Sequence, residues 1–411
     1  MTDDAVDSAY SWLRLAMTLL IATIASVGIW IYIAVMPAVQ AEFGADRGGA
    51  SLAYTFTMFG FAFGNLAMGR AVDRFGAATS IAVAAVLLGG GFVLATLAPS
   101  MMVLNIVHLI IGLGSAASFG PLMADISHWF VRRRGIAVTV TASGNYLAGA
   151  LWPWLLADML AEDGWRAVYL TLAAVVVFAV IPLSFGLRRR PSEGSLAAAA
   201  VSAGAASVSS GLSPRALQWL LCLAGLACCT AMSMPQVHIV AYCVDLGYGP
   251  SVGAEMLSLM LLGGVVSRVL SGMLADWVGG VKTVLIGSIL QTIALILYLP
   301  SDGMTTLYTV SLIFGLSQGG LVPAYAIIVR EYMEPKEAGA RVGFVIMSTV
   351  LGMALGGWMS GWIYDLTGSY TMAFLNGIAW NLVNLAVILM LIFRSRPGNK
   401  TGRGPVAMAA S

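Results

Sequence analysis

The sequence predicts an all-α membrane protein of twelve transmembrane helices, arranged as two parallel six-helix repeats. Of the 411 residues, 59% are hydrophobic and only 10% are charged, whereas soluble domains carry about 25% charged residues. The apolar residues fall into twelve runs, each close to the roughly 20 residues with which a helix crosses a bilayer. Short motifs also recur in the two halves at a spacing of half the chain. The net charge of +2 gives no indication of a nucleic-acid partner.

The twelve apolar runs form two groups of six. Backbone groups inside lipid must be satisfied within the segment, so each run is predicted to be a helix. The strands of an outer-membrane barrel would instead be about 10 residues long with alternating polarity. The first six runs are 13–36, 50–69, 77–97, 101–126, 135–158 and 165–187, and the second six are 215–240, 252–274, 282–300, 304–329, 339–362 and 372–394.

A polar segment separates the two groups. Residues 188–214 are rich in Ser, Ala and Gly and have no apolar period, which is typical of a flexible tether. We therefore predict an N-terminal six-helix bundle at 1–187, a flexible cytoplasmic linker at 188–214, a C-terminal six-helix bundle at 215–394 and a cytoplasmic tail at 395–411.

The basic residues predict the orientation, because cytoplasmic loops are enriched in Lys and Arg. With the N-terminus placed in the cytoplasm, 18 of the 21 Lys and Arg residues lie inside. Arg47 and Arg166 fall outside, and Arg268 falls within a membrane segment. The expectation is a multi-pass protein of the cell membrane with both termini in the cytoplasm.

The two halves repeat each other. The stretch GRAVDRFG at 69–76 follows the second run, and GMLADWVG at 272–279 follows the eighth, so the shared Gly, Asp and Gly positions are 203 residues apart. A fixed offset of half a chain indicates duplication. Two parallel six-helix repeats with a cavity between them form an architecture that supports alternating access.

These motifs resemble those of a known superfamily. The GxxxDRxG stretch is similar to the signature loop of the major facilitator superfamily, and the resemblance covers essentially the whole chain. Within it, WFVRRRGIA at 129–137 and SGNYLAG at 143–149 resemble the segment entering helix five of monocarboxylate transporters and their bacterial oxalate/formate exchanger relatives. Arg268, four residues before Gly272, stands where that family keeps its substrate arginine. The resemblance implies the major facilitator fold and a transporter.

Arg268 is the first candidate for substrate binding. An ionised Arg at the centre of a membrane helix costs about 2.5–3.5 kcal/mol on insertion scales, so it needs a partner, a water-filled cavity or a ligand. Its planar guanidinium matches a carboxylate with two hydrogen bonds. We therefore expect an organic-anion site. The alternatives are snorkelling to the inner interface and a structural pair with Asp276.

The chain departs from the family at three positions. Animal members place an Asp one turn before the substrate arginine, and here that position is Gly264. The family's Lys in helix one has no counterpart in 30–37, and the exchanger's second cation is missing from 339–362, where Arg341 lies at the cytoplasmic edge. One buried cation balances one negative charge better than two. This favours a monocarboxylate and leaves proton symport and anion exchange both open.

Four further residues are candidates for the substrate site. Asn145 and Tyr146 lie mid-depth in the fifth run, and Trp30 and Tyr32 lie in the first. Polar side chains at this depth need partners, which cavity water or a substrate supplies. The aromatic residues have an alternative role in the interfacial belt or the core.

The candidates for gating and coupling lie elsewhere. Asp125 ends the fourth run and is expected to pair with Arg74 or Arg70, with Asp73 facing the start of helix eleven. We call Asp73, Arg74 and Asp125 the predicted inner latch, which would hold an outward-open state. A proton-carrying role for Asp125 is the alternative.

His108, in the outer half of the fourth run, is a candidate for proton coupling, because imidazole titrates near neutral pH. Its alternative role is that of a hydrogen-bonded packing residue.

The predicted function is secondary transport of a small organic anion, a monocarboxylate, with proton symport or anion exchange. An efflux pump for drugs or other neutral or cationic solutes is the alternative, but such an exporter would be expected to hold an acid near the midplane. Asp125, Asp158 and Glu255 all lie near helix ends. The expected partners are a carboxylate, a proton or counter-anion and the lipid bilayer, and the monomer is expected to be the functional unit. Nothing in the motifs indicates an enzyme, a metal or a cofactor.

Overall fold

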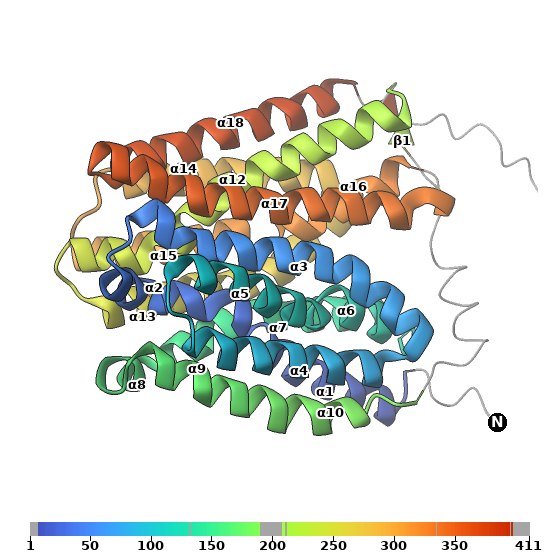
Figure 1. The fold of residues 1–411 in the computed structure, drawn as a ribbon. Coiled ribbons are helices and arrows are strands. Elements are labelled where there is room, and N and C mark those ends of the chain that lie inside the picture. The colour runs from blue at the N-terminus through green and yellow to red at the C-terminus, as the bar shows by residue number, and fades with distance from the viewer. Residues whose placement is uncertain are drawn as a thin grey trace, which may run out of the picture.

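The computed structural model describes residues 7–130, 133–189, 208–209, 212–333, 335–394 and 396–397, apart from the side chains of 73, 134, 208–209, 335–339 and 396–397. Its helices form two bundles that lie side by side, one from each half of the chain (Figure 1). The N-terminus of α1, the C-terminus of α10, the N-terminus of α12 and the C-terminus of α18 lie at the same end of the molecule. We call the opposite end the distal end.

The N-terminal bundle contains the first six predicted runs. Its elements are α1 (Ala9–Ala25), α2 (Val27–Phe43), α3 (Arg47–Phe75), α4 (Ala77–Thr96), α5 (Met101–Ser115), the 3₁₀ turn η1 (Ala116–Ser118), α6 (Gly120–Ile126), α7 (Arg134–Leu155), α8 (Ala157–Glu162), α9 (Gly164–Val175), the π-helical turn η2 (Val176–Val180) and α10 (Ile181–Phe185). Breaks divide the first run at Ser26 and the fourth at η1, and the two breaks meet, since Ser26 Oγ and Ser118 Oγ lie 2.8 Å apart.

The C-terminal bundle contains the second six runs. Its helices are α12 (Pro214–Asp245), α13 (Pro250–Val278), α14 (Gly280–Tyr298), α15 (Met304–Gln318), α16 (Leu321–Tyr332), α17 (Pro335–Thr367) and α18 (Tyr370–Arg394). Two short strands, β1 (Val208–Ser209) and β2 (Arg396–Pro397), pair antiparallel. The tenth run breaks between α15 and α16 at Gly319, which lies 203 residues after Ala116 in the break of the fourth run. The structural break therefore repeats at the same offset as the sequence motifs.

The all-α membrane fold predicted from the sequence is confirmed. Among the described residues, ten helical segments are long and apolar enough to cross a membrane, and α3 and α7, which form the other two runs, are not among the ten. Large apolar side chains such as Phe178, Trp277 and Phe393 lie exposed on the molecule, as expected where lipid is the solvent. The predicted linker falls mostly on residues outside the described ones, so its boundaries stay a prediction.

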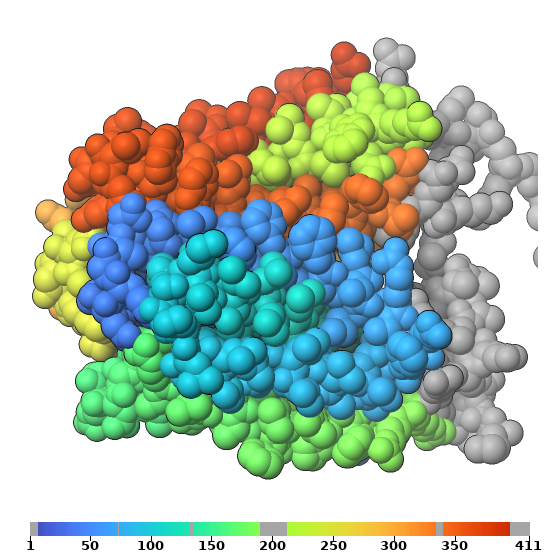
Figure 2. Space-filling view, viewed as in Figure 1, coloured from blue at the N-terminus to red at the C-terminus, as the bar shows by residue number. Residues whose placement is uncertain are grey.

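Small residues bring the two bundles into close contact. A Cβ atom built on Gly357 of α17 would lie 2.9 Å from the ring of Tyr54 in α3, and one on Gly361 would lie 2.8 Å from the carbonyl oxygen of Arg47. Glycine therefore lets α17 and α3 pack side by side (Figure 2). A second contact joins α7 to α13, where Gly149 makes room for Leu261.

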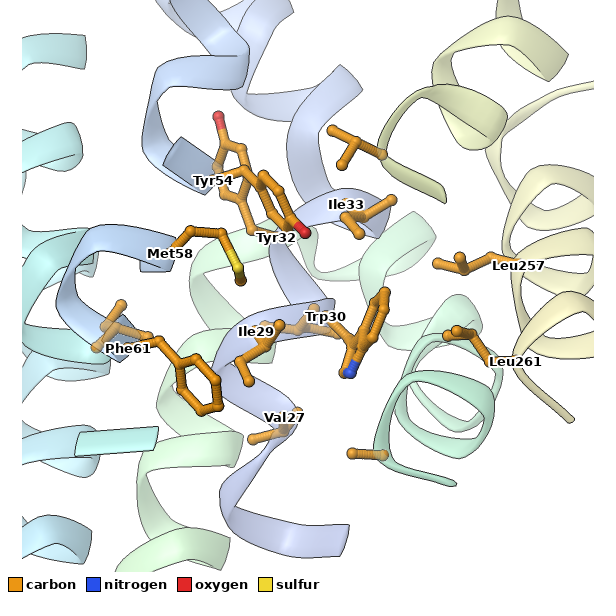
Figure 3. Close-up of a cluster of buried hydrophobic side chains, with 14 of the residues drawn as sticks. Val27, Ile29, Trp30, Tyr32, Ile33, Tyr54, Met58, Phe61, Leu257 and Leu261 are labelled. Carbon is orange, nitrogen blue, oxygen red and sulfur yellow. The ribbon is translucent and has the colours of Figure 1, made fainter. Parts of the chain in front are cut away.

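The buried core extends across this interface. Figure 3 shows Trp30 of α2 pointing toward Leu257 and Leu261 of α13. Tyr32 of α2 and Tyr54 and Met58 of α3 lie on the opposite side of α2. Side chains of both bundles thus belong to one apolar cluster.

Candidate functional site

Arg268 lies in the interior of the interface and is held by backbone carbonyls. Its side chain, on α13, is only 5% exposed. Nε donates to the carbonyl oxygen of Gly319 at 3.1 Å, and Nη1 donates to that of Ala142 in α7 at 2.5 Å. The guanidinium carbon lies 4.2 Å from the ring centroid of Tyr146. The arginine therefore touches both bundles at once.

The charge of Arg268 has no protein counter-ion in the part of the chain that the structure describes. The three ion pairs found there involve other arginines, so neither the Asp276 pair nor snorkelling is observed. Carbonyl dipoles and an aromatic face partly replace water around a buried cation, but they leave its net charge uncompensated. A guanidinium has five N–H donors. Such a group is suited to bind an anion between the two bundles.

Gly264, one turn before Arg268, makes space for the ring of Tyr146. A Cβ atom at position 264 would lie 2.9 Å from two ring carbons of Tyr146, too close for a larger side chain unless the ring moves. The family resemblance places an aspartate at this position, and here an aromatic ring fills the corresponding space. The tyrosine therefore provides a polarisable face to Arg268 where an acid would have provided a charge.

Trp30 and Asn145 extend the site into the N-terminal bundle. The indole Nε1 of Trp30 donates to Oδ1 of Asn145 at 3.3 Å. The rings of Trp30 and Tyr146 meet edge to face, with centroids 6.1 Å apart. Of the five substrate-site residues predicted from the sequence, the structure thus brings four together: Arg268, Tyr146, Asn145 and Trp30.

Tyr54 is a polar residue of this region that the sequence analysis missed. Its side chain on α3 is fully buried, and its hydroxyl has no hydrogen-bond partner among the described residues. Its ring lies against Gly357 of α17, at the interface of the two bundles. The position of a single tyrosine within an apolar run does not distinguish a site residue from a core residue such as Tyr169. Tyr54 could therefore not be predicted from the sequence.

Tyr32 and His108 lie apart from Arg268, inside the N-terminal bundle. The hydroxyl of Tyr32 donates to the carbonyl oxygen of Ala50 at 2.6 Å, and its ring packs on His108 with centroids 4.6 Å apart. The two ring nitrogens of His108 are hydrogen-bonded to Thr57 at 2.8 Å and to Tyr169 at 3.2 Å. Both side chains are fully buried, and His108 has the satisfied geometry of a packing residue.

Asp125 has a partner other than the one expected. It forms a two-point ion pair with Arg14 of α1, with Nη2–Oδ1 and Nε–Oδ2 distances of 2.8 and 2.9 Å. Arg14 is fully buried, donates also to the carbonyl oxygen of Leu187, and lies over the ring of Trp129. Because α1 passes beside α6, the nearer cation is Arg14, and the expected pairing with Arg74 or Arg70 is not found in this conformation.

The other members of the predicted inner latch are placed as follows. Arg74 is exposed, and its guanidinium lies 5.2 Å from the ring centroid of Phe75. The side chains of Asp73 and of residues 335–339, at the start of α17, lie outside the described part of the structure. The inner latch therefore stays a prediction.

A set of polar contacts joins the two bundles at the distal end. Nη2 of Arg47 contacts both carboxylate oxygens of Asp245 at 2.9 and 3.2 Å. The backbone N–H groups of Arg47 and Gly48 donate to Asp365 at 2.8 and 2.6 Å. The guanidinium also lies 4.9 Å from the ring centroid of Tyr364. We call these five residues the distal latch, whose partners lie 198 and 317–318 residues apart in sequence.

A cavity of about 310 Å³ lies near the distal ends of α7 and α13, lined by Trp154, Leu155, Ala157, Asp158, Ser251 and Glu255. Glu255 accepts a hydrogen bond from Tyr308. Two of the acids considered in the sequence analysis therefore lie together at helix ends, away from Arg268. Among the described residues, no group of three or more His, Cys, Asp and Glu side chains is placed to hold a metal ion.

Curated proteins similar to this chain are transporters. It is 29% identical over 341 residues to monocarboxylate transporter 13 of Bos taurus, covering 79% of this chain and 78% of that protein. It is 20% identical over 358 residues to the Agnestins efflux protein AgnL12 of Paecilomyces divaricatus, covering 85% of this chain and 80% of that protein. The chain is thus similar both to monocarboxylate transporters and to fungal efflux-type transporters.

The fold has close counterparts among solved structures. The nucleoside transporter NupG superimposes with a TM-score of 0.73 at 11% sequence identity, covering 92% of this chain and 99% of that one. The family model of the Major Facilitator Superfamily matches residues 18–305 and 244–407. Together these matches extend over both bundles and agree with the repeated motifs and breaks. The chain belongs to the Major Facilitator Superfamily, a family of membrane transporters and not of enzymes.

Proposed function

We propose that this protein is a secondary active transporter that moves a small monocarboxylate across the membrane by alternating access. One observation carries the proposal: Arg268 is a buried cation, contacts both bundles, and has no carboxylate partner among the described residues. A monovalent anion at this point would neutralise one charge and replace lost hydration with charge-assisted hydrogen bonds.

The walls of the site fit a small, partly apolar anion. Trp30 and Tyr146 provide aromatic faces, and Leu257 and Leu261 lie opposite Trp30 (Figure 3). Arg268 provides the charge and Asn145 a polar side chain. An aliphatic chain on the apolar walls and a carboxylate on the arginine would place the two parts of a monocarboxylate in matching surroundings.

The distal latch supports alternating access. We place the distal end on the outer side of the membrane, with the termini in the cytoplasm, in accord with the distribution of basic residues. The latch then closes the site toward the outside in this conformation. Opening the latch while the bundles close at the other end would expose Arg268 to the outside. The coupling is by proton symport or anion exchange, and Gly264 in place of the family's aspartate supports exchange.

The similarity to a fungal efflux protein favours a second candidate, export of a neutral or cationic solute. The aromatic and leucine walls would also suit such a solute. A cationic solute, however, would meet Arg268 at the centre, while Asp158 and Glu255 lie at the helix ends. Like charges in a low-dielectric site repel strongly, so the anion assignment is the better fit.

Reconstitution in liposomes tests the proposal. Uptake of radiolabelled acetate, lactate and pyruvate is compared with uptake of acetamide and of tetraethylammonium, each with and without an opposing gradient. We expect saturable uptake of one or more carboxylates and none of the amide or the cation. Stimulation by internal carboxylate would assign exchange, and stimulation by an inward proton gradient would assign symport. Transport of tetraethylammonium without carboxylate transport would support the efflux alternative and contradict the proposal.

A further inference from the structure

Two buried amides in the C-terminal bundle use only part of their hydrogen-bonding capacity. Gln236 of α12 donates from Nε2 to Oε1 of Gln318 in α15 at 2.8 Å. Both side chains are fully buried. Oε1 of Gln236 and Nε2 of Gln318 have no partner among the described residues. The pair therefore holds one acceptor oxygen and one donor nitrogen without a partner among the described residues, in the interior of the bundle.

This result does not depend on how the amides are turned. The oxygen and nitrogen of an amide are assigned from their hydrogen bonds, and turning only one of these two would place like groups against each other. Turning both keeps the bond and exchanges the free groups, which again leaves one donor and one acceptor. Buried polar groups without partners are uncommon and costly, so a group from outside the protein, a water molecule or part of a ligand, would stabilise this pair.

The pair is joined to the arginine site through the backbone of α15 and the segment that follows it. Gln318 immediately precedes Gly319, whose carbonyl oxygen accepts from Nε of Arg268. Val240, one helical turn after Gln236 on the same face of α12, packs against Gly253 of α13. The two helices that carry the amides, α12 and α15, both contact α13, which carries Arg268.

We propose that Gln236 and Gln318 form a second subsite of the substrate site, which binds a hydroxyl group on the carbon chain of the carboxylate. This inference rests on the proposed anion site at Arg268. A hydroxyl has one donor and two acceptor positions, so it can donate to the free oxygen and accept from the free nitrogen. A keto group only accepts and an ammonium group only donates. The substrate class is therefore a hydroxylated monocarboxylate rather than a simple fatty acid, keto acid or amino acid.

The amides suit this role because no internal bond has to break. The hydrogen bond between them holds both side chains in place, which lowers the entropy lost on binding. A site built to bond a hydroxyl discriminates strongly against the analogue that lacks it, because its polar groups are then left unpaired. We accordingly expect the two glutamines to determine specificity, while Arg268 determines that the substrate is an anion.

A matched set of four-carbon probes tests the subsite in the purified full-length protein. The set contains butanoate, hydroxybutanoates with the hydroxyl on the second, third or fourth carbon, and butanediol, with affinity measured by isothermal titration. At least one hydroxybutanoate is expected to bind about ten- to a hundredfold more tightly than butanoate. In the double variant Gln236→Leu/Gln318→Leu this ratio should fall to about one, with butanoate affinity retained, because removing both polar partners removes the advantage of the hydroxyl.

Gln291→Leu is the matched control. Gln291 is a third buried glutamine of the same bundle, but its amide nitrogen and oxygen both contact Cys228, at 3.4 and 3.7 Å. This variant should keep the wild-type preference for the hydroxylated probe. If the double variant does not fold, Gln318→Met removes the free donor, together with the oxygen that accepts from Gln236, with little change of volume and should lose most of the preference.

The outcomes separate the subsite from the anion site. A wild-type protein that binds butanoate and every hydroxybutanoate within about twofold overturns the subsite and leaves the anion site intact. Survival of the preference in the double variant or in Gln318→Met also overturns it. Binding of butanediol without binding of any carboxylate would support the subsite and contradict the anion site. Binding of none of the probes would overturn both.

Discussion

Two arginines are buried between the bundles, and they differ in what surrounds them. Arg47, at the distal end, forms an ion pair with Asp245, and its backbone N–H is capped by Asp365. Arg268, at the centre, has carbonyl groups and a tyrosine ring around it, and no carboxylate among the described residues. Among the described residues, the protein thus supplies a counter-ion to Arg47 and none to Arg268, and the proposed function assigns that counter-ion to the substrate.

The same comparison separates the polar contacts within a bundle from those between bundles. Arg14 and Asp125 pair inside the N-terminal bundle, as do His108, Thr57 and Tyr169. In the proposed alternating access, contacts inside one bundle would persist while the bundles rotate relative to each other, whereas contacts such as those of Arg47 would break. Stability and gating are therefore expected to respond to different substitutions.

The largest expected effect comes from giving Arg268 an internal counter-ion. In Gly264→Asp the new carboxylate lies one turn before Arg268, where an ion pair across four residues is favourable. Carboxylate binding should weaken about ten- to a hundredfold, because the arginine no longer offers a free charge. Gly264→Asn carries the same steric change against Tyr146 without the charge. Equal losses in the two variants, measured by titration calorimetry, would show that sterics alone explain the effect.

The second-largest effect is expected from removing the charges of the distal latch. Asp245→Asn combined with Asp365→Asn removes both acids that hold Arg47 and Gly48. Losing these charge-assisted bonds should shift the conformational equilibrium by about 1.5–3 kcal/mol toward outward opening. Cys229, which is fully buried here, should then react faster with a membrane-impermeant thiol reagent applied from outside, in a background with Cys222, Cys228 and Cys243 replaced by serine.

Glu42→Gln is the matched control for the latch. Glu42 pairs with Arg166 at 2.6 Å, but both residues belong to the N-terminal bundle and are exposed. This variant removes a charge pair without touching the interface, so the labelling rate of Cys229 should stay at the wild-type value. An unchanged rate in the double aspartate variant as well would contradict a gating role for the distal latch.

A smaller effect is expected at Asp125, and it separates two interpretations of this residue. With Arg14 as its partner inside one bundle, Asp125→Asn should lower the stability by about 2 kcal/mol and the Tm by several degrees. The labelling rate of Cys229 should not change. If labelling changes while the Tm does not, Asp125 acts in the predicted inner latch with Arg74 instead.

The smallest expected effect is at His108. Both of its ring nitrogens are already hydrogen-bonded within the N-terminal bundle, so His108→Gln should cost about 1 kcal/mol of stability. The pH dependence of carboxylate uptake should remain that of the wild type. A shifted pH profile in this variant would instead restore His108 as a proton-coupling residue.

Much of the fold and part of the site were predictable from the sequence. Twelve apolar runs and the 203-residue offset defined the repeats, because lipid imposes a simple rule on segment length. Arg268 was found for the same reason, since a charge at that depth is conspicuous. The distal latch was not found, because Arg47 meets Asp245 and Asp365 only after both halves have folded. Tyr54, Gln236 and Gln318 were also missed, since only the structure shows that their polar atoms lack partners.

The partner that Asp125 has in this conformation was also not predicted, for a related reason. Arg70 and Arg74 are nearer to it in sequence than Arg14, which lies 111 residues away. Charge and topology placed all four residues at one end of the bundle. They did not show which helices touch there, and that contact decides the pairing.

Titration calorimetry with a carboxylate and its uncharged amide tests the central claim most directly. Any carboxylate that the liposome experiment finds transported is titrated, beside its amide, into the wild type, Arg268→Ala and the exposed-arginine control Arg166→Ala. The account predicts that the wild type and Arg166→Ala bind the carboxylate at least about tenfold more tightly than the amide. In a folded Arg268→Ala protein the two ligands should bind equally weakly. A preference for the carboxylate that persists in Arg268→Ala would contradict the assignment of Arg268 as the anion site.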